Sequence, residues 1–124
     1  MKTIKFILPL FLAFTTICFS RISDTENDAL ISLYNSTNGQ NWNQKWDLTQ
    51  SSNSWHGVTV VNNKVVGLNL SSNNLSGKLP SNLGDLSNLK VLNLSLNKII
   101  GEIPTSICTI TSLENIVLFI NRLE

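Results

Sequence analysis

Aliphatic residues recur along the second half of the chain at a fixed interval of 24 residues. The segment 68–91, LNLSSNNLSGKLPSNLGDLSNLKV, is followed by 92–115, LNLSLNKIIGEIPTSICTITSLEN, and then by a third start, IVLFINRLE. Asparagine, glycine and proline recur between the aliphatic positions with the same period. A fixed period of this size indicates a solenoid, in which each unit buries its apolar face against its neighbours.

Each unit begins with the alternation that is typical of a strand with one buried face. Leu92 and Leu94 alternate with other residues, so we expect these leucines to point into the core. Asn97 then stands where the chain must turn, and its side-chain amide is predicted to pair with backbone groups that no ladder satisfies. Stacked with Asn73 and Asn121, it would form a row along the solenoid.

The rest of each unit is predicted to return the chain to the start of the next strand. Gly101 permits backbone angles or a close approach that a Cβ would forbid, and Pro104 ends an extended piece because it has no N–H to donate. Ile107, Ile110 and Leu113 are spaced by three. This spacing predicts a short helical or 3₁₀ segment with one inward face.

Residues 65–124 resemble the leucine-rich repeat family, whose pattern is L-x-x-L-x-L-x-x-N-x-L. The continuation L-x-G-x-(I/L)-P, present as LSGKLP and IIGEIP, is similar to the plant-type 24-residue subclass. The resemblance implies an α/β solenoid with a parallel β-sheet on the concave face, and binding of proteins, peptides or glycans without catalysis. It places strands near 66–71, 90–95 and 114–119, with a second short strand around 75–79 and 99–103.

Residues 21–64 are predicted to form an N-terminal cap ahead of two complete repeats and a truncated third. Ser23 and Glu26 have the spacing of a capping box, and the apolar residues that follow fall on one side of a helix near 25–35, which Asn38 would stop. The stretches NWNQKWDL and SWHGVTV resemble the caps of such repeats. The tryptophans expected to cover the open end of the first coil are Trp42, Trp46 and Trp55.

Cysteine usage departs from the plant members of the family. Their caps carry cysteines two residues before the cap tryptophan and five after it, where this chain has Asn53 and Val60, so this disulfide is absent. In this respect the cap is closer to the cysteine-poor caps of secreted bacterial relatives. Cys108 is the one cysteine after residue 20. We expect a small buried hydrophobe rather than a reactive thiol, because no histidine lies near it in sequence.

Residues 1–20 have the order of a secretory signal peptide. Two lysines precede an almost wholly apolar run at 6–19, and Cys18 and Ser20 lie at −3 and −1 of a cleavage site before Arg21. Two alternatives stay open. One is an uncleaved membrane anchor, although the run is shorter than the roughly 20 residues of a spanning helix. The other is a lipoprotein signal with Cys18 lipidated, although Ile17 is bulky for such a site.

Charge and motif content exclude several classes of function. Nine basic and eight acidic residues balance, and the lysines are scattered, so we expect no nucleic-acid partner. No Cys/His cluster has metal spacing and no glycine-rich loop follows a strand, so we expect no metal and no cofactor. His56 and Asp47 lack a nucleophile, and Asp85 and Glu102 fit solvated surface charges better than an acid/base couple. We therefore do not expect an enzyme.

A ligand is expected on the outward positions of the predicted strands, most of which are small and polar. Phe119 is the exception, because its equivalents are serines, and exposed aromatic side chains are over-represented in binding hot spots. The alternative is that Phe119 packs against a neighbour such as Val117, or against material beyond Glu124. The candidate ligand-binding residues are Asn69, Ser71, Lys90, Val91, Asn93, Ser95, Asn115, Val117 and Phe119.

The third unit stops before its glycine, proline and return segment, so we expect a fragment of a longer protein. The pattern predicts a secreted or cell-surface module that binds a protein, peptide or glycan, with membrane contact only through downstream segments or a lipid anchor. The alternatives are the N-terminal ectodomain of a receptor-kinase-like membrane receptor and a structural or adhesin stalk. Glycosylation of the N-x-S/T sequons stays open at Asn35, Asn69, Asn74 and Asn93.

Overall fold

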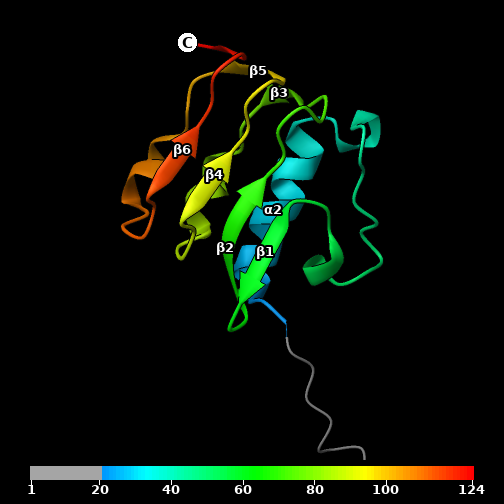
Figure 1. The fold of residues 1–124 in the computed structure, drawn as a ribbon, viewed down its shortest axis with the longest axis vertical. Coiled ribbons are helices and arrows are strands. Elements are labelled where there is room, and N and C mark those ends of the chain that lie inside the picture. Colours follow the sequence, from blue (N-terminus) through cyan, green and yellow to red (C-terminus); the bar gives the residue numbers. More distant parts are fainter. Residues whose placement is uncertain (1–20) are drawn as a thin grey trace, which may run out of the picture.

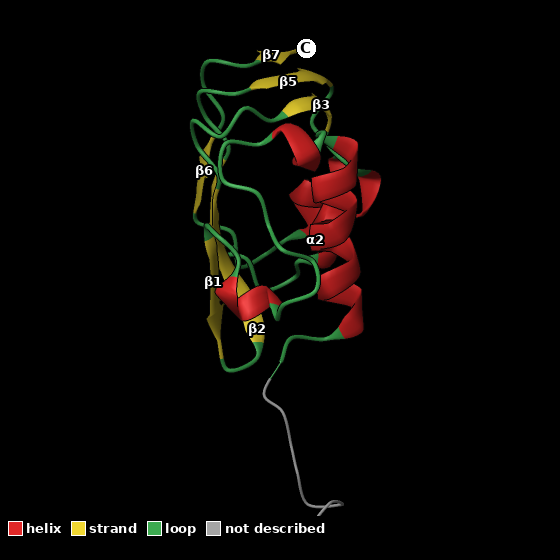
Figure 2. Cartoon of the chain, turned by 90° about the vertical axis from the view of Figure 1, so that its right-hand side faces the viewer, coloured by secondary structure: helices red, strands yellow, loops and turns green. Residues whose placement is uncertain are grey.

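The computed structural model describes residues 21–124, so the predicted signal peptide and its two alternatives lie outside the described residues. The described chain forms two layers with the apolar core between them (Figure 2). One layer is a four-stranded sheet, sheet A. The other holds helix α2 (Asp24–Ser36) and two 3₁₀ helices, Ser81–Asp85 and Thr105–Thr109. A three-stranded sheet, sheet B, lies at one end of these layers.

Sheet A has the strand order β1-β2-β4-β6, with bounds Val58–Val61, Lys64–Asn69, Val91–Asn93 and Asn115–Val117. Its last three strands, β2, β4 and β6, lie side by side (Figure 1). They run parallel in a register that pairs Leu68 with Leu92 and Leu92 with Ile116. This register confirms the predicted solenoid and its parallel sheet. The sequence pattern did not predict β1, which runs antiparallel to β2.

Sheet B consists of three short parallel strands, β3 (Ser76–Lys78), β5 (Lys98–Gly101) and β7 (Arg122–Leu123). β3 and β5 are the second short strands that the resemblance implied. Gly77 precedes the end of β3 with φ 97°, and a Cβ there would lie 2.5 Å from the Ser36 carbonyl oxygen at the end of α2. Only glycine allows this strand to approach the helix so closely.

The recurring aliphatic residues form the core between the layers. Leu68, Leu70, Leu92 and Leu94 are at most 1% exposed, as predicted for inward positions. Ile116 occupies the matching position in β6 but is 46% exposed, because β6 is the edge strand of sheet A. Burial of these side chains therefore depends on a neighbouring coil at each side.

The two 3₁₀ helices are the predicted return segments. Ile107 and Ile110 are 3% and 6% exposed, which confirms their inward face. The prediction that Cys108 is buried is wrong, because its free thiol is exposed. A 3₁₀ helix has about three residues per turn. Ile107 and Ile110 therefore share the inner face of the helix. Cys108 directly follows Ile107 and points away from the core.

The predicted row of asparagines is present where the strands of sheet A end. The Oδ1 atom of Asn97 accepts the backbone N–H groups of Asn73 and Leu75, both at 3.0 Å. Its Nδ2 atom donates to three backbone carbonyls at 2.9, 3.0 and 3.1 Å. Asn121 repeats the pattern by accepting the Ile99 N–H at 3.0 Å. Each amide thus satisfies buried backbone groups and joins adjacent coils.

The cap contains a cluster of aromatic rings behind the first coil. Trp42, Trp46 and Trp55 are 3%, 3% and 5% exposed, which confirms the predicted cap core. Trp46 stacks on Trp55 with ring centroids 4.8 Å apart and meets Trp42 edge-on at 4.9 Å. Each indole N–H donates to a backbone carbonyl at 2.8–3.0 Å. The rings are therefore buried without an unpaired donor.

Helix α2 is tied to the repeats through its first turn. Ser23 and Glu26 form the predicted capping box. The second carboxylate oxygen of Glu26 accepts the Val65 N–H at 3.0 Å, at the start of β2. Glu26 is only 5% exposed. One buried carboxylate thus stabilises the helix N-terminus and also positions the first strand of the repeats.

Candidate functional site

The outer face of sheet A points away from α2 and the 3₁₀ helices and is open to solvent (Figure 2). We call it the sheet face. The parallel register arranges its side chains in rows across the coils. Gly67, Val91 and Asn115 form one row, and Asn69, Asn93 and Val117 form the next. Thr59 of β1 lies beside Gly67 and completes the sheet face.

Asn69 and Asn93 present amide groups in a fixed orientation. The Oδ1 atom of Asn69 accepts the Ser71 N–H at 3.2 Å, and the Oδ1 atom of Asn93 accepts the Ser95 N–H at 3.1 Å. These local bonds shape the turn after each strand. Within the described chain, neither Nδ2 group donates a hydrogen bond to another residue. Two N–H₂ donors on adjacent strands are therefore available to a ligand on the sheet face.

Apolar side chains lie next to these donors. Val91 is 41% exposed in β4, and Val117 is half-buried in β6. Phe119 follows β6 and is 59% exposed. More than half of its surface is therefore open to solvent. The sheet face and its border combine neutral donors with apolar contact area, which suits a partner that is itself uncharged at the contact.

Three of the predicted site residues lie off the sheet face. Ser95 is 2% exposed and its hydroxyl donates to Asn93 Oδ1 at 2.7 Å, so the expectation that it faces a ligand is wrong. Ser71 is half-buried in the turn after β2. Lys90 is exposed one residue before Val91, out of phase with the outward positions of β4.

Two groups of exposed residues near this surface were not predicted from the sequence. The first is β1, with Thr59 at its centre; a Cβ on Gly67 would lie 3.2 Å from the Thr59 Cβ, so glycine fits the close packing there. The second is the turn position that Ser72, Leu96 and Ile120 share at the 24-residue period. All three have positive φ, at 53°, 59° and 57°. In the sequence, this second group could have been found from the 24-residue alignment, which places the aliphatic residues Leu96 and Ile120 at the position of the polar Ser72.

The candidate acid and histidine of the cap are not arranged as a pair. The Asp47 carboxylate accepts the Thr49 hydroxyl at 2.6 Å and the Thr49 N–H at 3.0 Å. These hydrogen bonds, the hydroxyl first, hold the pKa of Asp47 below its usual value. His56 uses its backbone carbonyl to accept the Trp46 indole N–H. Both residues therefore contribute to the structure of the cap.

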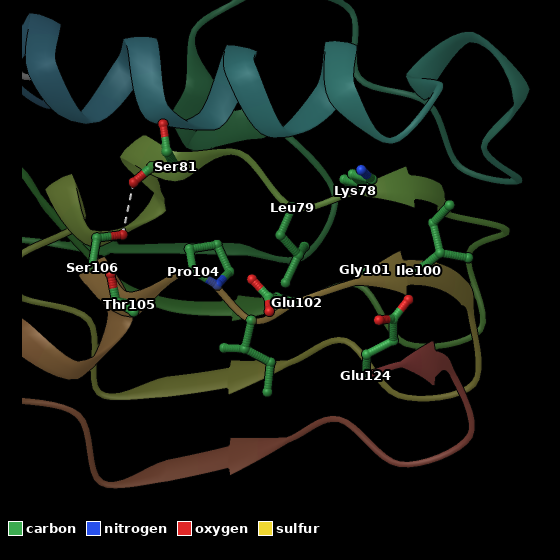
Figure 3. A pocket seen from close by; sticks show the side chains of 11 residues that line it. Lys78, Leu79, Ser81, Ile100, Gly101, Glu102, Pro104, Thr105, Ser106 and Glu124 are labelled. Carbon is green, nitrogen blue, oxygen red and sulfur yellow. Dashed lines mark hydrogen bonds between the residues drawn. The ribbon is translucent and has the colours of Figure 1, made fainter.

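A hollow of about 620 Å³ lies between β5 and the second 3₁₀ helix, away from the sheet face (Figure 3). Two of its polar residues take part in the fold: the Ser106 hydroxyl donates to the Ser81 carbonyl at 2.8 Å, and the Lys78 stem lies against Gly101. Across residues 21–124, no three His, Cys, Asp or Glu side chains gather as metal ligands. No helix of that part of the chain is both long and apolar enough to cross a bilayer.

A family model described as Leucine Rich Repeat matches residues 64–86 and 88–110. These matches coincide with the two coils whose strands, asparagines and 3₁₀ segments are described above. The chain belongs to the leucine-rich repeat family, and its repeats are of the plant type.

Proteins similar to this chain include two from a plant and one from a bacterium. Polygalacturonase inhibitor 1 of Arabidopsis thaliana is 31% identical over 97 residues, which are 73% of this chain and 29% of the inhibitor. The crystal structure of the BIR2 ectodomain from Arabidopsis thaliana matches with a TM-score of 0.67 and 28% identity, over 83% of this chain and 57% of that one. A leucine-rich repeat protein from Bacteroides eggerthii matches with a TM-score of 0.53 and 30% identity, over 66% and 14% of the two chains. This chain spans less than two thirds of each of these proteins.

Proposed function

We propose that this chain belongs to a secreted or cell-surface protein and that its sheet face binds a protein or peptide without catalysis. One observation carries the proposal. The register of sheet A places the amide donors of Asn69 and Asn93 on adjacent strands, next to the exposed side chains of Val91 and Phe119.

The chemistry of these groups suits a polypeptide ligand. Amide N–H₂ groups donate to backbone carbonyls, which every polypeptide offers whatever its sequence. Val91 and Phe119 supply apolar area that excludes water from those hydrogen bonds, as in the centre of a protein interface. The rigid sheet holds the donors in place before binding, so little conformational entropy is lost.

The relatives support the location and the class of partner. Polygalacturonase inhibitor 1 is named as an inhibitor of an enzyme, which is itself a protein. The BIR2 structure is an ectodomain. Together with the signal peptide predicted at residues 1–20, these relatives favour an extracellular binding module. They also favour the alternative in which this module is the N-terminal ectodomain of a membrane receptor.

The test compares two aliphatic residues of equal fractional exposure. Val91 on the sheet face and Ile100 on β5 are both 41% exposed, so Val91→Glu and Ile100→Glu introduce the same charge at matched positions. The purified full chain and both variants are applied to an array of extracellular proteins and peptides. We expect a partner that wild type and Ile100→Glu bind and that Val91→Glu does not. Equal binding by the two variants would show that the sheet face is not the site.

Phe119 is tested on the same partner. Because an exposed aromatic side chain at the edge of the site would become buried on binding, Phe119→Ala is expected to weaken the affinity by about tenfold. Unchanged affinity would remove Phe119 from the site and leave the rest of the sheet face in place.

A further inference from the structure

Three turns with the same backbone geometry lie at the end of sheet A where β2, β4 and β6 finish. Their central residues are Ser72, Leu96 and Ile120. The Ser72 N–H donates to the Ser95 carbonyl at 3.1 Å, and the Leu96 N–H donates to the Phe119 carbonyl at 3.0 Å. These bonds join the first two turns to the next coil.

Two of these turns carry aliphatic side chains that the fold does not require. Leu96 is 44% exposed although coils flank it on both sides, and Ile120 is 64% exposed. Glycine and asparagine tolerate positive φ best, and a β-branched residue such as Ile120 tolerates it least. Ser72 shows that a polar side chain is compatible with the same turn. Leu96 and Ile120 thus combine a positive φ with exposure of apolar surface.

The two side chains border a shallow hollow of about 380 Å³, which we call the turn hollow. The charged side chains at the turn hollow are positive. Lys98 lines the turn hollow, and Arg122 holds the equivalent position in the repeat of the next coil. Within residues 21–124 neither cation has a carboxylate within salt-bridge distance, and none of the lining residues is acidic. The residues that line the turn hollow are Asn43, Ser72, Asn74, Leu96, Asn97, Lys98 and Ile120.

We propose that the turn hollow is a second docking site, which takes an apolar side chain from an acidic segment of a protein partner. Leu96 and Ile120 contact the apolar side chain, and Lys98 and Arg122 pair with flanking carboxylates. Binding removes exposed aliphatic surface from water, which offsets the cost of placing leucine and isoleucine in these turns. The unpaired cations select an acidic partner and reject a basic one. The site is separate from the sheet face and does not depend on it.

The experiment uses an immobilised array of twelve-residue synthetic peptides and the labelled full chain. One set carries a single Phe, Leu or Ile between two Glu residues in a Gly/Ser background. Control sets replace the apolar residue by Ser or both Glu residues by Lys. We expect the chain to bind the first set at least about tenfold more tightly than either control set, since both the anchor and the charges contribute.

The variant Leu96→Asn/Ile120→Asn removes the apolar side chains at the border of the turn hollow and introduces asparagines, which tolerate positive φ. We expect it to fold, with a melting temperature equal to or above that of wild type, and to lose about tenfold or more in affinity for the acidic–apolar peptides. Leu48→Asn is the matched control, because Leu48 is 41% exposed but lies in the cap, outside the residues that line the turn hollow. It should bind as wild type does.

Lys98→Gln tests the charge, with Lys78→Gln as the control for an exposed lysine outside the turn hollow. We expect Lys98→Gln to reduce both the affinity and its dependence on salt, and Lys78→Gln to change neither. Equal effects of the two lysines would point to non-specific attraction and overturn the proposed pairing.

Other results would overturn the proposal and leave the sheet face unaffected. The proposal is wrong if the array shows no preference for acidic–apolar peptides, or if Leu96→Asn/Ile120→Asn binds them as wild type does. If Val91→Asn abolishes that binding instead, the peptides dock on the sheet face. If wild type is a dimer by analytical ultracentrifugation and the double variant is a monomer, the occupant is a second copy of the chain and not an acidic partner.

Discussion

The cap and the repeats are stabilised in different ways. In the repeats one set of contacts recurs: inward leucines, a buried asparagine and a 3₁₀ segment in each coil. In the cap every contact is made once, by stacked tryptophans and by long-range hydrogen bonds such as that from Val65 to Glu26. A repeated contact can be weakened in one coil while the others persist. A contact made once has no substitute, so the cap should be the more sensitive of the two regions.

The largest effect is expected from Trp46→Ala. Trp46 contacts Trp42 and Trp55 and is 3% exposed, so its removal leaves a cavity in the centre of the cap. We expect the free energy of unfolding to fall by about 3–5 kcal/mol. Urea denaturation followed by circular dichroism measures it. The control is Phe119→Ala, whose ring is 59% exposed and whose loss should change stability by less than about 0.5 kcal/mol. Similar losses for both variants would contradict the special role of the cap.

A smaller and graded effect is expected along the row of asparagines. Asn97→Ala leaves buried N–H and C=O groups of two adjacent coils without partners and should cost about 3 kcal/mol. Asn121 lies in the edge coil and is half-buried, so water can replace part of its hydrogen bonding. Asn121→Ala should therefore cost about 1 kcal/mol. The same denaturation experiment compares them, and equal losses would show that position along the solenoid does not matter.

The smallest effect concerns the exposed loop of the cap. The Thr49 hydroxyl and N–H lower the pKa of Asp47, so the ionised carboxylate is favoured in the folded state. This contribution is present above the pKa of the unfolded chain and is lost as the pH falls through the lower pKa of the folded chain. We expect Asp47→Asn to melt slightly below wild type at neutral pH, with a difference that shrinks under acid conditions. Thr49→Ala should reproduce part of the difference. If the difference in melting temperature between wild type and Asp47→Asn grew as the pH fell, the ionised Asp47 carboxylate would not be the stabilising form.

The periodic half of the molecule could be predicted from the sequence in detail. Repetition at 24 residues indicates which side chains occupy equivalent sites, so one interpreted coil defines the next. Leu92 and Leu94 are buried, Asn97 bridges the coils, and Ile107 faces inward, all as predicted. The capping box at Ser23 was equally accessible, because it is a local motif whose two partners lie three residues apart.

Contacts that do not recur with the 24-residue period were not predicted. The antiparallel pairing of β1 with β2 is made through a two-residue turn at Asn62 and Asn63, which occurs once in the chain and therefore has no equivalent position to support it. Strand alternation places Ser95 at an outward position. It does not indicate that the Ser95 hydroxyl donates a hydrogen bond to the side chain of Asn93. Within the candidate site, alternation predicted Val91 and Asn93 on the sheet face. It could not predict Leu96, because that residue lies in a turn, where strand alternation no longer applies.

The hydrogen bond between Glu26 and Val65 has a consequence for the route by which the chain folds. It closes a segment of 39 residues, and the bond from Asn82 to Ser32 closes one of 50. The bonds of Asn97 and Asn121 to neighbouring coils close segments of only 22–27 residues. Closing a longer segment of chain costs more conformational entropy and slows folding. Neighbouring coils can therefore pack onto one another before α2 docks. We therefore expect the docking of α2 to be a late step in folding, which completes the hydrophobic core.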